Sequence, residues 1–257
     1  MTANPEPELP PLHESLTWLT PLSEARAAAL IAFLTEPAPA DVLDLGCGWG
    51  ELLLRVLAAA PRARGRGIDS APASISRAVQ QARARGLAER VELEVVPGRD
   101  ADLTPADAVI CIGASQIWGP PVEEAQPLDY AAALQALRQL VRPGGRLVYG
   151  EAIWSAPPHP AATAPLSGRD DEFVTLDALV ELTREAGFEV LRVDQADLDE
   201  WDVFEAGFRD RFTRWLAAHG DDDPAAPAIR DRHEQQRAAY EEDYRGVLGM
   251  AYLCLCG

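Results

Sequence analysis

The chain has 257 residues, of which 47% are hydrophobic and 25% charged, a composition typical of an ordinary globular protein. Its 41 acidic residues exceed its 23 basic residues, which gives a formal net charge of -18. Because phosphate backbones are bound by clustered Lys and Arg, this charge disfavours nucleic acid and favours a small molecule or another protein as partner. No apolar run reaches the roughly 18 residues that span a membrane, and the first residues lack the basic and apolar regions of a signal peptide. We therefore expect a cytoplasmic protein.

The first part of the chain alternates apolar strands with helical segments. Ser23 is a candidate cap for a helix that carries Leu30, Phe33 and Leu34. The following pattern predicts strands at 42–45, 67–69, 91–96, 108–113 and 146–150, and helices at 51–60, 73–85 and about 130–140. Strands separated by helices of about ten residues indicate βαβ units and a parallel sheet, so an α/β fold is expected.

The second part begins in the same way but then inserts helices. Thr175 is a candidate cap for a helix that ends at Gly187, and a strand is predicted at 188–193. Two long helical stretches follow, at about 200–219 and 225–245, before a last strand at 248–256. We expect one domain over 1–257, made of an N-terminal helical segment (1–40), a cofactor-binding core (41–195), a helical cap inserted between the last two strands (199–246), and the last strand (247–257).

Four cysteines are present, and no two of them form a CxxC pair. Cys47, Cys111, Cys254 and Cys256 are therefore expected to be reduced thiols, and no metal site is predicted.

A glycine-rich loop follows the first predicted strand and leads directly into a helix. Its sequence, from Asp44 to Gly50, is DLGCGWG. Glycines let the backbone approach a ligand without a Cβ atom, and the N-terminus of a helix offers free N–H groups to an anion such as the carboxylate of methionine. A dinucleotide-binding loop has its third glycine one residue later than Gly50, where this chain has Glu51. Asp44 also suits an amino group better than a diphosphate.

Two further carboxylates follow predicted strands. Asp69 ends the second strand, from which open α/β folds hydrogen-bond a ribose diol. An alternative is that Asp69 or Ser70 only caps the helix that begins near Pro72. Asp100 follows the third strand, where it could accept a hydrogen bond from an adenine amino group, or it could belong to an ordinary loop turn.

These residues together resemble the successive motifs of class I S-adenosylmethionine-dependent methyltransferases. The resemblance spans about residues 40–195 and rests on VLDLGCGWGELLLRV, GIDSAPASI, PGRDAD, ADAVICIGASQIWG and VRPGGRLVYGEAIW. DEFVTL and YRGVLGMAYL look like a group of largely uncharacterised bacterial small-molecule methyltransferases. GCGWG is also similar to cyclopropane fatty acid synthases, whose later motifs are not evident in the chain.

The resemblance implies a Rossmann-like, seven-stranded and mostly parallel sheet with helices on both faces and an antiparallel last strand. It implies S-adenosylmethionine as cofactor and S-adenosylhomocysteine as product, with Gly46, Gly48 and Gly50 lining the site, Asp69 on ribose and Asp100 on adenine. The complete predicted cofactor site comprises Asp44, Gly46, Cys47, Gly48, Gly50, Asp69, Ser70, Asp100, Ala101, Ile112 and Gly113. Where the family more often has His, this chain has Gln116.

Methyl transfer from a sulfonium can proceed largely by proximity and alignment, so a catalytic dyad is not required. If the acceptor must lose a proton, the candidate bases are Glu151, His13 and, through a water molecule, Glu172. Alternatively, Glu151 is an ordinary capped or paired surface residue and His13 is merely solvated.

Aromatic residues gather in the segments that could cover a pocket. The predicted acceptor pocket consists of Trp18, Gln116, Trp118 and Trp154. Trp201 and Phe204 could also belong to this pocket, or could form an ordinary core stripe with Phe208.

The leading hypothesis is methyl transfer to a small-molecule acceptor by a monomer or homodimer. The alternatives are an enzyme with other S-adenosylmethionine chemistry such as cyclopropanation, a cofactor-binding protein without turnover, and an NAD-dependent oxidoreductase. The position of the third glycine argues against the last.

Overall fold

The computed structural model describes residues 7–119, 127–164 and 168–257. Its centre is one seven-stranded sheet in the order β3-β2-β1-β4-β5-β7-β6. Every neighbouring pair is parallel except those of β7, which is antiparallel to both β5 and β6. The expected α/β fold with an antiparallel last strand is confirmed. The strands are β1 (Asp41–Leu45), β2 (Arg64–Asp69), β3 (Val91–Val95), β4 (Ala106–Ile112), β5 (Val141–Trp154), β6 (Glu189–Gln195) and β7 (Leu248–Cys256).

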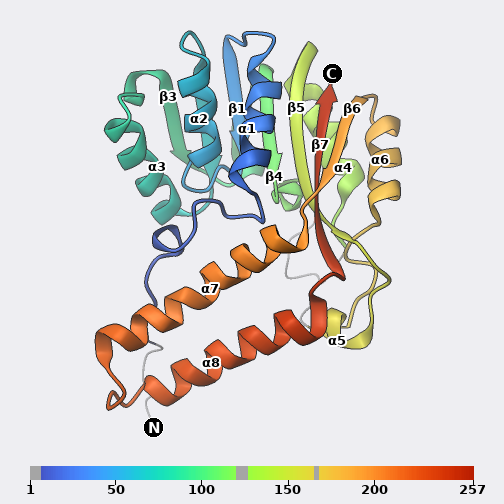
Figure 1. Ribbon diagram of the computed structural model, residues 1–257. Coiled ribbons are helices and arrows are strands. Elements are labelled where there is room, and N and C mark those ends of the chain that lie inside the picture. Colours follow the sequence, from blue (N-terminus) through green and yellow to red (C-terminus); the bar gives the residue numbers. More distant parts are fainter. Residues whose placement is uncertain (1–6, 120–126, 165–167) are drawn as a thin grey trace.

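Helices cover both faces of this sheet (Figure 1). One face packs against α1 (Glu24–Thr35), α2 (Glu51–Ala59) and α3 (Pro72–Ala84), and the other against α4 (Tyr130–Leu140) and α6 (Leu176–Glu185). Side chains such as Leu53 on the first face and Leu134 on the second are completely buried. The predicted caps are confirmed, because Ser23 accepts a hydrogen bond from Arg26 N and Thr175 accepts one from Ala178 N.

Two long helices lie side by side beyond one end of the sheet (Figure 1). They are α7 (Leu198–His219) and α8 (Ala226–Ala238), and a π-helical turn (Ala239–Tyr244) joins α8 to β7. Together they form the insertion predicted between the last two strands, here called the cap. The second predicted helical stretch, about 225–245, therefore corresponds to α8 together with the π-helical turn that continues it to Tyr244. Tyr244 donates a hydrogen bond to the buried Glu205 of α7 at 2.8 Å. The far end of the cap has a small core of its own, formed by Phe212, Trp215, Ala226 and Ile229.

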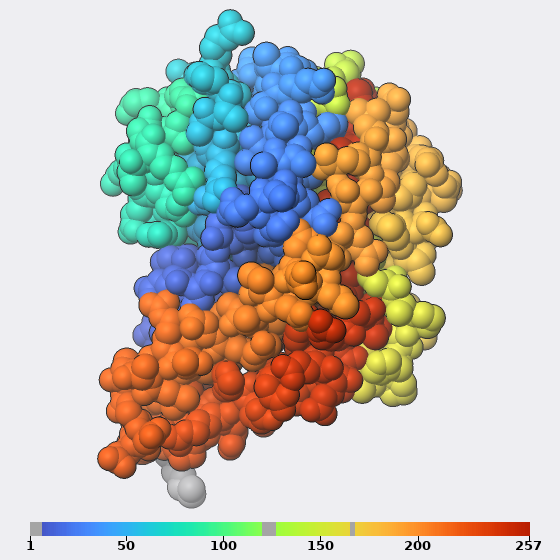
Figure 2. All heavy atoms as spheres, viewed as in Figure 1, coloured from blue at the N-terminus to red at the C-terminus, as the bar shows by residue number. Residues whose placement is uncertain are grey.

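The first described residues pack against the cap, and the two form one continuous surface below the sheet (Figure 2). The Ser15 hydroxyl donates to Asp210 at 2.6 Å, and Arg211 Nε donates to the carbonyl of Pro10 at 2.6 Å. No helix in the described ranges is long and apolar enough to cross a membrane.

A buried ion pair joins the cap to α1. Glu200 lies in the first turn of α7, and its Oε1 accepts from Ser23 N at 2.8 Å and from Arg26 Nε at 3.0 Å. Its Oε2 accepts from the Arg26 guanidinium at 2.8 Å and from Asp197 N at 3.0 Å. Only 6% of Glu200 is exposed. This carboxylate therefore fixes the start of the cap against the helix that follows residues 17–22.

Candidate functional site

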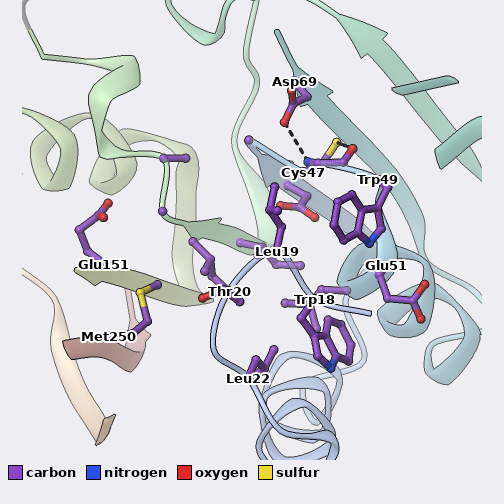
Figure 3. A pocket seen from close by; sticks show the side chains of 18 of the residues that line it. Trp18, Leu19, Thr20, Leu22, Cys47, Trp49, Glu51, Asp69, Glu151 and Met250 are labelled. Carbon is purple, nitrogen blue, oxygen red and sulfur yellow. Dashed lines mark hydrogen bonds between the residues drawn. The ribbon is translucent and has the colours of Figure 1, made fainter. Parts of the chain in front are cut away.

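A cavity of about 460 Å³ lies at the carboxyl ends of β1, β2, β4 and β5. Residues 17–22 line it, as do Trp201 and Phe204 from α7. Met250 of β7 also lines the cavity (Figure 3). Parallel strands bring their carboxyl ends to one edge of a sheet, which is where open α/β folds bind ligands. The volume is in the range of small-molecule sites, roughly 300–1,000 Å³.

The glycine loop forms one wall of this cavity, and two of its glycines are required for different reasons. Gly46 has φ +68°, and a Cβ atom there would lie 2.7 Å from the Cβ of Ala114, so the space is already filled by protein. Gly48 has φ +54°, but a Cβ atom there would meet nothing within 4 Å. The first glycine therefore permits packing, whereas the second keeps space open beside the cavity.

This contrast gives a paired prediction. Gly46→Ala is expected to lower the free energy of unfolding by about 2 kcal/mol, because it adds overpacking to left-handed strain. Gly48→Ala is expected to lower it by about 1 kcal/mol, from the backbone strain alone, and to weaken S-adenosylhomocysteine binding about tenfold. Urea unfolding and calorimetric titration of both variants check this. Equal losses of stability and of affinity in the two variants would contradict it.

Asp69 at the end of β2 holds the glycine loop in place. Its Oδ2 accepts from Gly48 N at 2.9 Å, and its Oδ1 accepts from Ala71 N at 2.8 Å. The residue at the N-cap of α3 is Ala71, which has no side-chain hydrogen bond to the helix, so Asp69 bridges two loops instead of capping the helix. Each carboxylate oxygen can accept a further hydrogen bond. Asp69 also lines the cavity, so that capacity is available to a ligand.

Asp44 is a buried carboxylate under the same loop, with only 4% of the residue exposed. Burial and the nearby charge of Asp69 raise the pKa of Asp44 to about 8. At neutral pH the side chain is therefore largely protonated, and a bound cation would favour its ionised form.

Glu151 of β5 lies at the opposite end of the cavity, near Met250 (Figure 3). It is 5% exposed, and its two oxygens accept hydrogen bonds from Ser115 N at 3.2 Å and Ala152 N at 3.0 Å. Burial raises the pKa of Glu151 above its ordinary value, although these hydrogen bonds oppose the shift. The structure thus excludes the alternative of a surface carboxylate.

Most of the predicted site residues meet in this cavity. Those that line it are Asp44, Gly46, Cys47, Gly48, Asp69, Ser70, Ile112, Gly113, Trp18, Gln116 and Glu151. Segments far apart in the sequence therefore converge on one cavity.

Several predicted cofactor residues lie outside the cavity wall. Gly50 caps α2, and a Cβ atom there would lie 3.1 Å from the Cβ of Ala78 in α3, so this glycine serves packing. Asp100 is exposed at the end of the short turn Gly98–Asp100, and Ala101 packs among apolar residues beyond it. Gly98, which starts that turn, lines the cavity in their place.

Two predicted pocket tryptophans and two candidate bases also lie elsewhere. Trp154 donates its indole N–H to the carbonyl of Asp170 at 2.8 Å, and Trp118 packs beside the core under α4. The ring of His13 packs edge to face against Trp49, with ring centroids 6.2 Å apart. Glu172 pairs with Arg169. None of the four lines the cavity, so Glu151 is the candidate base that the geometry favours.

Sequence reasoning did not place Trp49, Leu19, Thr20 or Met250 in the site. Trp49 donates its indole N–H to Thr17 O at 2.9 Å and so ties residues 17–22 to the glycine loop. Because Trp49 lies inside the glycine-loop motif, the sequence could have placed it in the site. Met250 lies on a distant strand that no motif links to the site. Trp201 and Phe204, left open between pocket and core, pack edge to face at 5.9 Å and also line the cavity.

Comparisons with known proteins agree with this geometry. A family model described as a methyltransferase domain matches residues 43–147. The uncharacterised protein YjhP of Escherichia coli is 32% identical over 210 residues, which are 80% of each chain. S-adenosylmethionine-dependent methyltransferases from Geobacter sulfurreducens and Thiobacillus denitrificans, both crystallised with S-adenosylhomocysteine, superpose with TM-scores of 0.79 and 0.78. They are 27% and 29% identical, and each alignment covers 95% of both chains. The chain belongs to the class I S-adenosylmethionine-dependent methyltransferases.

Proposed function

We propose that the protein transfers a methyl group to a small molecule bound between the glycine loop and the cap. The observation that carries this proposal is the covered cavity, which has the glycine loop at one end and Glu151 at the other. Residues 17–22 and α7 leave a space of about 460 Å³, which suits a small acceptor better than a folded protein surface. The net charge of -18 and the carboxylates in the cavity also disfavour a nucleic-acid acceptor.

The residues at the glycine-loop end of the cavity fit the cofactor. The open space beside Gly48 admits a ligand close to the backbone, and Asp69 can accept hydrogen bonds from ribose hydroxyls. Asp44 would hold the amino group, and the N-terminus of α2 would face the carboxylate. When bound, S-adenosylmethionine supplies an electrophilic methyl carbon attached to a sulfonium leaving group.

The other residues of the cavity wall would orient the acceptor and exclude water. Trp201, Phe204 and Met250 give apolar walls, and Glu151 provides one buried proton acceptor. Holding the two reactants in line is the main contribution that such a site can make to methyl transfer.

The test is incubation of the purified protein with S-adenosylmethionine and a library of small molecules, monitored by mass spectrometry. We expect an acceptor that gains one methyl group and an equal amount of S-adenosylhomocysteine. A protein or nucleic-acid acceptor modified in preference to every small molecule would contradict the proposal. Failure to bind S-adenosylhomocysteine at all would contradict the assigned cofactor site.

The raised pKa of Asp44 gives a separate prediction about protons. In the free protein the carboxyl stays protonated up to about pH 8, and a bound ammonium group would favour its ionised form. Binding of S-adenosylhomocysteine at pH 7 is therefore expected to release up to one proton, and the release should disappear well above pH 8. Calorimetry in buffers of different ionisation enthalpy measures it. Asp44→Asn should abolish the release, and proton uptake by the native protein would contradict the assignment.

A further inference from the structure

The charged side chains of the cavity wall are all acidic among the described residues. Its ionisable side chains at neutral pH are the carboxyl groups of Asp44, Glu51, Asp69 and Glu151, and no Arg, Lys or His among the described residues lines it. The remaining stretches of the chain, 1–6, 120–126 and 165–167, contain no Arg, Lys or His in their sequence. Anionic ligands need a cation or several aimed N–H donors when they are buried. The wall therefore disfavours a carboxylate or phosphate acceptor.

Three of these four carboxyl groups already have a role. Asp44 and Asp69 lie beside the glycine loop, where the cofactor is assigned. Glu51 in the first turn of α2 forms ion pairs with Arg55 and Arg85, which neutralise its charge. Glu151 remains as the carboxylate at the acceptor end of the cavity.

Glu151 has no cationic partner among the described residues. It accepts hydrogen bonds from the backbone N–H groups of Ser115 and Ala152 and from the side chain of Ser115, all of which are neutral donors. The ionisable groups around it are the thiol of Cys111 on β4, the phenol of Tyr130 on α4 and the phenol of Tyr149 on β5, all of which burial keeps neutral at pH 7. Glu151 is only 5% exposed, and a buried carboxylate without a cationic partner lowers the stability of the fold. A bound ligand that carries a positive charge would offset this cost.

Aromatic rings line the same cavity as Glu151. They are Trp18 from the N-terminal segment and Trp201 and Phe204 from α7. Met250 lies near Glu151, whereas Trp18 lies on the side of Glu51 (Figure 3). Aromatic rings attract cations through their π faces and also bind apolar groups. A cavity wall that combines a buried carboxylate with such rings suits an ammonium group on an apolar body.

We propose that the acceptor is an amine with an apolar, preferably aromatic, body, and that the carboxylate of Glu151 binds its ammonium group and accepts its proton. This inference rests on the proposed function and names its substrate class. The ammonium transfers one proton to Glu151, and the nitrogen lone pair then forms the N–C bond while the C–S bond breaks and sulfur keeps the electron pair. The products are a protonated methylated amine, S-adenosylhomocysteine and protonated Glu151, which returns its proton to solvent.

The experiment uses three probes of similar shape and different charge: phenethylamine, phenethyl alcohol and phenylacetate. Each is titrated into the protein loaded with S-adenosylhomocysteine and is offered as an acceptor with S-adenosylmethionine. We expect phenethylamine to bind at least about tenfold more tightly than the other two, since a hydrogen bond to a charged group contributes that much, and to gain a methyl group. Glu151→Gln keeps the side-chain shape and should bring the affinities of amine and alcohol within about twofold of each other.

Two controls isolate the charge of Glu151. Glu181→Gln, in an exposed position on α6, should keep the preference for the amine. Glu151→Gln turns an amide NH2 towards one of the two backbone N–H groups, which lowers stability equally at every pH. It also removes a buried charge whose raised pKa makes it unfavourable to folding above the ordinary pKa of 4.5, so the urea midpoint of the variant relative to the native protein should rise from pH 5 to pH 8.

The outcomes separate this inference from the proposed function. If S-adenosylhomocysteine binds but phenylacetate or phenethyl alcohol matches the amine, or if no amine binds at millimolar concentration, the substrate class is overturned and the methyltransferase stands. If Glu151→Gln weakens S-adenosylmethionine but not S-adenosylhomocysteine or the amine, Glu151 serves the sulfonium instead and the inference is also overturned. Failure of S-adenosylhomocysteine to bind would overturn the proposed function itself.

Discussion

Asp69→Ala is expected to weaken S-adenosylhomocysteine binding about a hundredfold. Under the proposed function this carboxylate would accept two charge-assisted hydrogen bonds from ribose, which together would contribute about 3 kcal/mol. The same side chain braces the glycine loop through Gly48 N and Ala71 N, so the substitution also loosens the loop. Calorimetric titration measures the affinity, and the native far-ultraviolet circular dichroism of the variant shows that it is folded.

Two further variants sharpen this test. Asp69→Asn retains one acceptor oxygen and should fall between the native protein and Asp69→Ala. Asp100→Ala should have a much smaller effect, because Asp100 is exposed and lies outside the cavity wall. An unchanged affinity in Asp69→Ala would show that Asp69 does not bind the ribose. A large loss of affinity in Asp100→Ala would mean that Asp100 moves to the ligand on binding.

Glu200→Ala is expected to lower the free energy of unfolding by about 3 kcal/mol, because it removes the main carboxylate partner of the partly buried Arg26 and leaves only the longer contact with Asp194 at 3.7 Å. It also removes the acceptor for Ser23 N and Asp197 N, so the start of α7 loses its connection to α1. For a chain of this size the melting temperature should fall by about 6 to 12 °C. Adding Arg26→Met should recover part of the loss, since the partly buried guanidinium that lost its main partner is then gone. A loss of unfolding free energy below about 1 kcal/mol would show that the pair stabilises the contact between α1 and α7 no more than a surface ion pair does.

The same pair has a defined pH dependence. Burial by itself would raise the pKa of Glu200, but hydrogen bonds from Arg26 and Ser23 outweigh it and lower the pKa to about 2 from its ordinary value of 4.5. A depressed pKa means that the stabilisation is complete above pH 4.5 and is lost as the pH falls towards 2. The difference in unfolding free energy between the native protein and Glu200→Gln should therefore shrink between pH 5 and pH 2. Glu181→Gln, in an exposed position, is the control.

The sequence was sufficient for those parts of the fold that depend on local periodicity and end signals. The helix capped by Ser23, the glycine loop after β1 and Asp69 at the end of β2 each follow from a few neighbouring residues. The extent of β5 does not, because its pairing with β7 continues from Arg146 to Trp154, well past the predicted end at 150. Long-range pairing, not propensity, sets that boundary.

The acceptor side of the cavity was predicted less well for a physical reason. Trp154 and Glu151 lie on one strand, three residues apart, and the choice between them depends on side-chain direction. Trp154 turns towards Phe173, with ring centroids 5.2 Å apart, whereas Glu151 faces the cavity. Met250 and Trp201 belong to elements that reach the site only through the topology of the sheet. Such convergence is not visible in sequence spacing.

The cap leaves the sheet after β6 and returns to it at β7, and these two places are adjacent. Gln195 on β6 is paired with Ala251 on β7, and the next residue, Ala196, donates its N–H to the carbonyl of Met250 at 2.8 Å. The helical hairpin therefore starts and finishes at hydrogen-bonded neighbours, so exchange of the whole hairpin places little constraint on the strands beneath it. An exchanged hairpin would still have to fit the N-terminal segment and α1, which contact α7 through Ser15 and Arg26. A change of acceptor would therefore involve both of these parts of the chain, while the nucleoside-binding strands could stay as they are.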